Sequence, residues 1–200
     1  MIVKTLQKVA LLLIVFSLTA TASTQVVNPV VVLETSLGQI ELNLDEKQAP
    51  LTVKNFLQYV DSGHYNGTIF HRVIDNFMIQ GGGFNGKLEK VSSNAPIQNE
   101  AHNGLQNDNF TIAMARTNDP HSATAQFFIN VKDNSFLNHR GKNNQDYGYA
   151  VFGKVTKGGS VINRIKKSAT TQNGRFANLP TENIIIKKAY RKDKKQKKQL

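Results

Sequence analysis

The chain of 200 residues contains no cysteine. Disulfides, thiolate nucleophiles and cysteine-based zinc or iron–sulfur sites are therefore excluded. Proline occurs only 5 times and glycine 14 times, which argues against collagen-like and low-complexity chains. Hydrophobic residues make up 40% and charged residues 20% of the sequence. The length and these values are typical of one globular domain, or of two small ones at most. A domain of this size buries roughly 70% of the surface of its unfolded chain.

Signatures of metalloenzymes and hydrolases are also missing. The five histidines are not spaced as H-x-x-x-H or H-E-x-x-H, and we expect neither a metal ion nor another cofactor. No G-x-S-x-G element is present, so a serine hydrolase has no support. The glycine-rich residues 81–87 (GGGFNGK) come close to two phosphate-binding motifs, but no helix pattern follows them. We interpret them as a turn that requires positive φ.

The formal charge of +11 is concentrated at the two ends of the chain. Residues 1–22 carry +2 and residues 187–200 carry +7, so residues 23–186 are close to neutral at +2. We expect residues 188–200 to form a basic, disordered tail. Electrostatic contact of this tail with an anionic surface or nucleic acid is the functional alternative. The near-neutral body argues against a protein whose main activity is to bind an anionic polymer.

The one long apolar run lies at the N-terminus. A short basic segment ends at Lys8, an apolar stretch covers residues 9–18, and Ala20-Thr21-Ala22 follows. This order is typical of a secretory signal peptide that is cleaved after Ala22. As a helix, the stretch is too short to span a hydrocarbon core of roughly 30 Å. The sequence therefore predicts a signal peptide over residues 1–22 and an exported protein.

Short alternating segments dominate the rest of the chain. Residues 30–34 and 39–44 flank a glycine-containing turn and predict a hairpin. Apolar residues at helical spacing after Pro50 predict a helix that ends near Gly63, and a second short helix is expected after Gly158-Gly159. Further strands are predicted at residues 69–74, 77–80, 111–114, 126–131, 149–155 and 183–187. The pattern indicates a mainly β fold, an antiparallel barrel or sandwich with two accessory helices.

Alternation within the strand at residues 69–74 suggests where its charged side chain points. Phe70, Arg72 and Ile74 are expected on one face. His71 and Val73 are expected on the other.

The neighbouring strands add groups that could surround this arginine. Met78 and Gln80 share one face of their strand, and Gln126 and Phe128 share the polar face of theirs. Phe128 beside Met78, with Arg72 and two glutamines, would form an apolar pocket rimmed by a guanidinium and amides. The alternative is an arginine buried in the core and satisfied by the two glutamines.

These residues lie in blocks that resemble the cyclophilin family of peptidyl-prolyl cis–trans isomerases. The blocks occur in the family order and cover about residues 30–187, nearly the whole mature chain. With the predicted signal peptide, the chain is similar to the periplasmic members of this family in Gram-negative bacteria. The matching blocks are FHRV (70–73), FMIQGG (77–82), TIAMAR (111–116), SATAQFFI (122–129), FL (136–137) and YAVFGKV (149–155).

The resemblance implies a closed eight-stranded antiparallel barrel capped by two α-helices, with the isomerase domain over residues 23–187. It implies a monomeric, cofactor-free enzyme that accelerates rotation of X–Pro bonds in proline-containing polypeptides, during the folding of exported proteins in the periplasm. A proline-binding scaffold or holdase chaperone with incidental turnover is the alternative. The presence of both Arg72 and Gln80 favours the enzyme.

The resemblance also assigns roles within the site. Arg72 matches the catalytic arginine, and Gln80 matches the glutamine that holds it. Phe136 stands where many eukaryotic members carry a tryptophan that donates to cyclosporin, so we expect weak binding of cyclosporin-type ligands. The proline pocket matches Phe77, Met78, Phe128, Leu137 and Tyr149, and the groups that grip the substrate chain match Gln126 and the backbone of Ala115 and Arg116.

Overall fold

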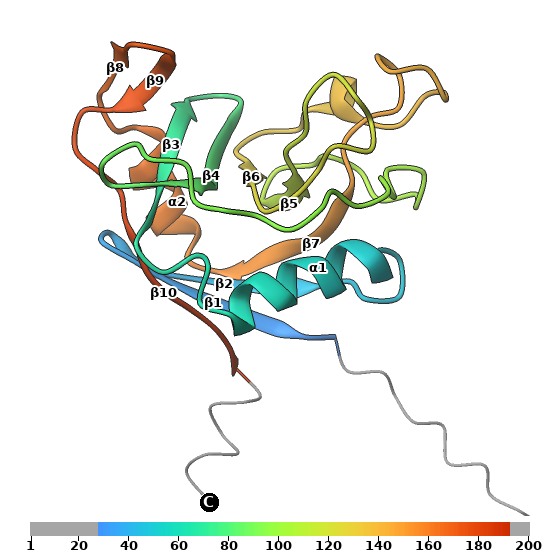
Figure 1. Ribbon diagram of the computed structural model, residues 1–200, viewed down its shortest axis with the longest axis horizontal. Helices are drawn as coiled ribbons and strands as arrows, with labels where there is room; N and C mark the ends of the chain where they lie inside the picture. The colour runs from blue at the N-terminus through green and yellow to red at the C-terminus, as the bar shows by residue number, and fades with distance from the viewer. Residues whose placement is uncertain (1–27, 193–200) are drawn as a thin grey trace, which may run out of the picture.

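Eight strands of the computed structural model, which describes residues 28–192, form one antiparallel sheet (Figure 1). Neighbouring strands follow the order β10-β1-β2-β7-β5-β6-β4-β3. The two edges of the sheet approach each other where the N–H of Phe70 in β3 donates to the carbonyl of Ile184, just before β10, at 3.0 Å. The predicted eight-stranded antiparallel barrel is confirmed, in a nearly closed form. The strands are β1 (Val30–Thr35), β2 (Gly38–Leu44), β3 (Thr68–Ile74), β4 (Met78–Asn85), β5 (Thr111–Met114), β6 (Phe127–Asn130), β7 (Val151–Lys157) and β10 (Ile186–Arg191).

Both predicted helices are present. Helix α1 (Pro50–Asp61) has proline in its first turn, and helix α2 (Gly159–Lys166) follows Gly158, whose φ is +96°. The end of α1 is set by Gly63 at φ +75°, because the N–H groups of Gly63 and His64 turn back to the carbonyls of the last helical turn. A 3₁₀ helix, η1 (Ser135–Leu137), lies in the loop after β6.

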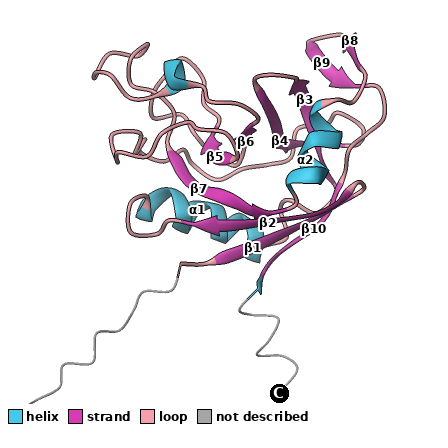
Figure 2. Ribbon diagram, turned by 180° about the vertical axis from the view of Figure 1, so that it is seen from behind, coloured by secondary structure: helices cyan, strands magenta, loops and turns pink. Residues whose placement is uncertain are grey.

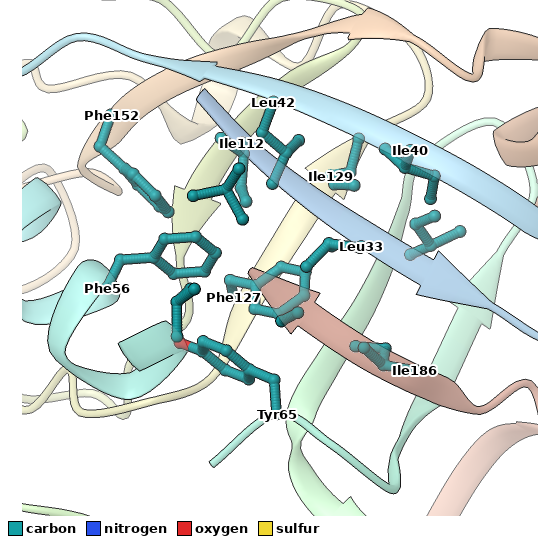
Figure 3. Packing of buried hydrophobic residues seen from close by; sticks show 14 of the residues in the cluster. Leu33, Ile40, Leu42, Phe56, Tyr65, Ile112, Phe127, Ile129, Phe152 and Ile186 are labelled. Carbon is teal, nitrogen blue, oxygen red and sulfur yellow. The ribbon is translucent and has the colours of Figure 1, made fainter. Parts of the chain in front are cut away.

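The barrel interior is filled by apolar side chains that alternate along the strands. Phe56 from α1 lies 5.1 Å, centroid to centroid, from Tyr65 and from Phe152, and meets Phe127 edge-on (Figure 3). The alternation sends Phe127 and Ile129 inward and places the intervening Phe128 on the outer face of the sheet, where it is buried in a second apolar cluster. Phe128, a predicted pocket residue, therefore lies outside the core.

A β-bulge in β3 changes the predicted facing of its residues. The register shifts between Phe70 and Arg72, and both Phe70 and Val73 enter the core. His71 instead packs against aromatic rings outside the core, and Arg72 stands opposite Gln80. The predictions that Phe70 shares a face with Arg72 and that His71 shares one with Val73 are both wrong, because the extra residue of the bulge breaks strict alternation.

The glycine-rich residues 81–87 do not form the predicted turn at their start. Strand β4 continues through them to Asn85, and Gly82 adopts φ +83° within the strand. A Cβ on Gly82 would lie 2.8 Å from the ring of Tyr65, so the core itself requires glycine there.

The hairpin of β8 (Thr170–Asn173) and β9 (Phe176–Pro180) was not predicted (Figure 2). All four residues of β8 are exposed, so no apolar alternation marks it.

The C-terminal boundary also differs from the prediction. Strand β10 pairs with β1 as far as Arg191, and Ala189 is buried. The domain therefore extends past residue 187, and residues 188–191 belong to the barrel rather than to a tail. The predicted signal peptide and residues 193–200 lie outside the described part. Among residues 28–192, no helix is long and apolar enough to cross a membrane.

Candidate active site

A second apolar cluster lies on the outer face of the sheet, where β4, β6, β5 and β7 run side by side. Arg72 stands opposite Gln80, Gln80 opposite Phe128, and Phe128 opposite Ala113. One row across four strands therefore leads from a guanidinium to an apolar floor. The buried members of the cluster are Met78, Ala113, Phe128, Leu137 and Val151.

A pocket of about 90 Å³ opens over this floor. That is well above the roughly 10–15 Å³ that one water molecule needs, so the pocket has room for a small apolar group. It brings together most of the predicted site residues. Arg72 is half-buried and lines this outer pocket, so the alternative of an arginine buried in the core is wrong. The lining consists of Arg72, Phe77, Met78, Gln80, Ala115, Arg116, Phe128, Leu137 and Tyr149.

Arg72 is half-buried and is held by a chain of amides. Its Nη1 donates to Oε1 of Gln80 at 3.5 Å, and Nε2 of Gln80 donates to Oε1 of Gln126 at 3.0 Å. The guanidinium carbon also lies 5.9 Å from the ring centroid of Phe77. Because Gln126 accepts from the Gln80 amide, the Gln80 oxygen is left facing the arginine.

Two predicted residues lie outside the pocket lining. Gln126 stands behind Gln80, and the carbonyl of Gln126 accepts from the N–H of Ala115 at 3.0 Å. Phe136 is 58% exposed and stacks on Phe77 with ring centroids 5.7 Å apart. Both residues therefore adjoin the pocket from its rim.

Gly83 was not predicted as part of the site, yet it makes room for Gln126. A Cβ at Gly83 would lie 2.5 Å from Cδ of Gln126. Any side chain there must displace the glutamine that orients Gln80. The run of three glycines is the only sequence signal for this role, and such a run indicates a turn just as readily.

A buried network of asparagines was also missed. Nδ2 of Asn134 donates to Oδ1 of Asn130 and to the carbonyl of Phe77, both at 2.8 Å. Nδ2 of Asn107 donates to the carbonyls of Leu137 and Tyr149 at 3.2 and 3.3 Å. These bonds fix the backbone of three pocket-lining residues.

His71, next to the arginine in sequence, is buried beside Phe84 with ring centroids 4.8 Å apart. Burial lowers the pKa of His71 to about 4, and the neighbouring Arg72 guanidinium acts in the same direction. The imidazole is therefore neutral near pH 7, and Arg72 carries the positive charge at this place.

The site thus combines an apolar recess with a fixed hydrogen-bond donor at its edge. In residues 28–192, no three His, Asp or Glu side chains gather in a group that could hold a metal ion. Binding an apolar ring and donating to an atom beside it are the actions that this geometry supports.

Comparison with known proteins shows to which family the chain belongs. Residues 30–191 match the family described as cyclophilin type peptidyl-prolyl cis-trans isomerase/CLD. Peptidyl-prolyl cis-trans isomerase cyp18 of Streptomyces antibioticus is 60% identical over 157 residues, which are 78% of this chain and 95% of the relative. Peptidyl-prolyl cis-trans isomerase A of Dickeya dadantii is 53% identical over 170 residues, 85% of each chain.

A solved structure supports the same conclusion. The cyclophilin type isomerase of Cryptosporidium parvum, crystallised in the presence of the dipeptide Ala-Pro, has a TM-score of 0.67 and 27% identity, and the match covers 81% of this chain and 98% of that one. The chain belongs to the cyclophilin-type family and is a peptidyl-prolyl cis–trans isomerase. The predicted resemblance and enzyme class are confirmed.

Proposed function

We propose that this isomerase uses Arg72 and the outer pocket to accelerate X–Pro rotation during the folding of exported proteins. The observation that carries the assignment of the site is the guanidinium of Arg72, held by Gln80 at the edge of an apolar pocket. The Ala-Pro dipeptide named for the Cryptosporidium relative supports proline-containing peptides as the ligand class.

The chemistry of the X–Pro bond suits such a donor. The amide C–N bond has partial double-bond character, which gives a rotation barrier of roughly 18–20 kcal/mol. In the twisted transition state conjugation is lost, and the proline nitrogen gains a localised lone pair. A guanidinium N–H donates to this lone pair more strongly than to the planar ground state, so it lowers the barrier. No covalent step is required.

The remaining groups bind the substrate on either side of the rotating bond. Phe77, Met78 and Phe128 hold the proline ring. The substrate segment that precedes the proline then rotates about the X–Pro bond. The carbonyl of Ala115 and the N–H of Arg116 make no hydrogen bond to any described residue. They are therefore available to pair with the substrate backbone.

The test is the rate of cis–trans exchange in an Ala-Pro peptide, which NMR measures in the presence of the protein comprising residues 23–200. At substoichiometric concentration, an isomerase accelerates exchange between the cis and trans forms and thereby broadens their NMR signals. A proline-binding scaffold shifts the signals without accelerating exchange, and that result would overturn the proposal.

The export of the protein is a separate part of the proposal. The signal-like residues 1–22 support delivery to the periplasm, with Ser23 as the new N-terminus. N-terminal sequencing of the protein from a periplasmic extract tests it. Retention of Met1 on a membrane-bound protein would contradict it.

We further propose that the enzyme is a monomer and that its basic C-terminal residues contact anionic surfaces. Size-exclusion chromatography tests the first point. Retention on an anionic resin tests the contact with anionic surfaces. We expect this retention to weaken with added salt and to be lost when residues 193–200 are deleted. The deletion should leave the rate of peptide exchange unchanged.

A further inference from the structure

The side chain of Arg116 bridges two loops at the rim of the pocket. Its Nε donates to the carbonyl of Gly148 at 3.0 Å and its Nη2 to the carbonyl of Asn144 at 3.1 Å. Its Nη1 donates to the carbonyls of Thr117 and Asn118 at 2.9 and 3.4 Å. The three nitrogens of the guanidinium are thus all engaged by main-chain oxygens, from residues 117–118 on one side and 144–148 on the other.

The same guanidinium lies over a ring that lines the pocket. Its carbon is 4.5 Å from the ring centroid of Tyr149, within the range of a cation–π contact. The Tyr149 ring in turn meets Phe128, at the pocket floor, nearly perpendicular and with centroids 5.7 Å apart. Arg116 itself lines the pocket, and its guanidinium supports the neighbouring wall formed by Tyr149.

Gly148 gives this support a fixed point next to the tyrosine. Its carbonyl accepts from Nδ2 of Asn99 at 3.1 Å as well as from Arg116. Its φ is +77°, and a Cβ there would lie 2.6 Å from the backbone nitrogen of His139. The backbone just before Tyr149 is therefore held in one conformation.

We propose that the Arg116 side chain is a positioning residue for the proline pocket. It fixes the Tyr149 ring and the loop at 144–148, and it directs its charge at main-chain carbonyls rather than at the substrate. The planar fork of arginine suits this task, because acceptors on two loops and a ring face must be satisfied together. Lysine offers a single rotatable ammonium and cannot reproduce the arrangement.

The inference rests on the proposed function of the pocket, and it is tested by steady-state kinetics of the full mature chain. The variants are Arg116→Ala, Arg116→Lys and, as a matched control, Arg140→Ala. Arg140 carries the same charge and lies in the loop that leads to Tyr149, but it pairs with the side chain of Asp146 at 2.7 Å and is exposed. The substrates are two Ala-Pro peptides that differ only in an acidic or a neutral flanking residue.

We expect Arg116→Ala to raise KM about tenfold with kcat changed by less than about threefold, because the pocket wall contributes to ground-state binding. Arg116→Lys should resemble Arg116→Ala, and Arg140→Ala should resemble the wild type. The rise in KM should be equal for both peptides and insensitive to salt. The ring signals of Tyr149 in NMR spectra should move in both Arg116 variants.

Several outcomes would overturn the inference. Wild-type KM in Arg116→Ala would do so, and so would a loss confined to the acidic peptide, since it would mean that Arg116 binds substrate charge. If Arg116→Ala does not fold, wild-type KM and Tyr149 signals in Arg116→Lys would contradict the inference. Absence of exchange by the wild type would instead overturn the proposed function.

Discussion

At the residue scale, the orientation of the proposed catalytic arginine depends on residues that do not touch it. Gln126 fixes the amide of Gln80, and Gln80 presents its oxygen to Arg72. Gly83 leaves the space that Gln126 occupies. A donor is useful in catalysis only when it is held in place before the reaction, so this support is part of the site.

Gly83→Ala tests the support. The added methyl group must displace the Gln126 side chain and break its bond to Gln80. The loss of one hydrogen bond, about 0.5–1.5 kcal/mol, predicts that kcat/KM falls roughly threefold to tenfold. Gly86→Ala is the control, because its Cβ would meet only Nδ2 of Asn183, at 3.4 Å. Equal activity of the two variants would show that Gln126 does not act through Gln80.

Phe136→Trp tests the rim. Phe136 is largely exposed and stacks on Phe77, so an indole at this position has room to present its N–H to a ligand. We expect cyclosporin to bind more tightly by about 0.5–1.5 kcal/mol. Isothermal titration calorimetry measures this change. An unchanged affinity would mean that the rim is not aligned as the resemblance implies.

At the element scale, helix α1 depends on a distant residue for its N-terminus. Its own N-cap, Ala49, offers no side-chain acceptor. The buried Glu100 accepts from the N–H of Leu51 at 3.1 Å, and from the N–H and hydroxyl of Thr52 at 2.8 and 2.7 Å. The carboxylate also opposes the positive end of the helix dipole. The loop at residue 100 is thereby tied to the helix that fills the barrel with Phe56.

Glu100→Ala should therefore lower the free energy of unfolding by about 1–3 kcal/mol, because buried donors lose their acceptor. Urea titration measures the change. Glu46→Ala, which removes an exposed carboxylate just before the same helix, should stay within about 0.5 kcal/mol of the wild type. A loss as small for Glu100 as for Glu46 would show that water replaces the cap.

The sequence predicted those elements that carry a periodic apolar pattern. Helix α1 and the hairpin of β1 and β2 have such a pattern. The outward position of Phe128 is also predictable, because this aromatic residue stands on the otherwise polar face of its strand. The β8–β9 hairpin, with its exposed β8, and the bulge at His71 have no such signal. Glu100 and Asn107 act on elements far away in sequence, and spacing along the chain cannot indicate such contacts.

At the scale of the whole molecule, the barrel separates stability from binding. The interior is filled by one apolar cluster, and the pocket stands on a second cluster outside it. Substitutions at the pocket rim can therefore change activity without opening the core. This separation lets a variant of Arg72 be compared with the wild type at similar stability.

His71 makes the stability of the barrel depend on pH. Its folded pKa, about 4, lies below its ordinary value of 6.5, so the unfolded chain binds the extra proton between these values. The free energy of unfolding that is linked to the neutral His71 is fully present above pH 6.5 and is lost as the pH falls toward 4. At pH 5 the loss relative to pH 8 amounts to about 2 kcal/mol.

Urea unfolding at pH 8 and pH 5 measures the effect. The fall in stability should be smaller by about this amount in His71→Gln, whatever the variant's stability at pH 8. His102→Gln, which changes an exposed histidine, should fall as much as the wild type. Parallel behaviour of His71→Gln and the wild type would contradict the burial of a neutral imidazole.

The central claim is that Arg72 lowers the X–Pro rotation barrier. The most direct test is the rate of cis–trans exchange of an Ala-Pro peptide, measured for Arg72→Ala and Arg72→Lys. A thermal melt of each variant is recorded beside it. Arg72→Ala should keep the melting temperature and lose roughly tenfold to a hundredfold in kcat/KM, because a charge-assisted hydrogen bond is worth about 1.5–3 kcal/mol. Arg72→Lys should recover only part of the loss, since Gln80 orients a planar fork. Wild-type exchange by Arg72→Ala at an unchanged melting temperature would contradict the account.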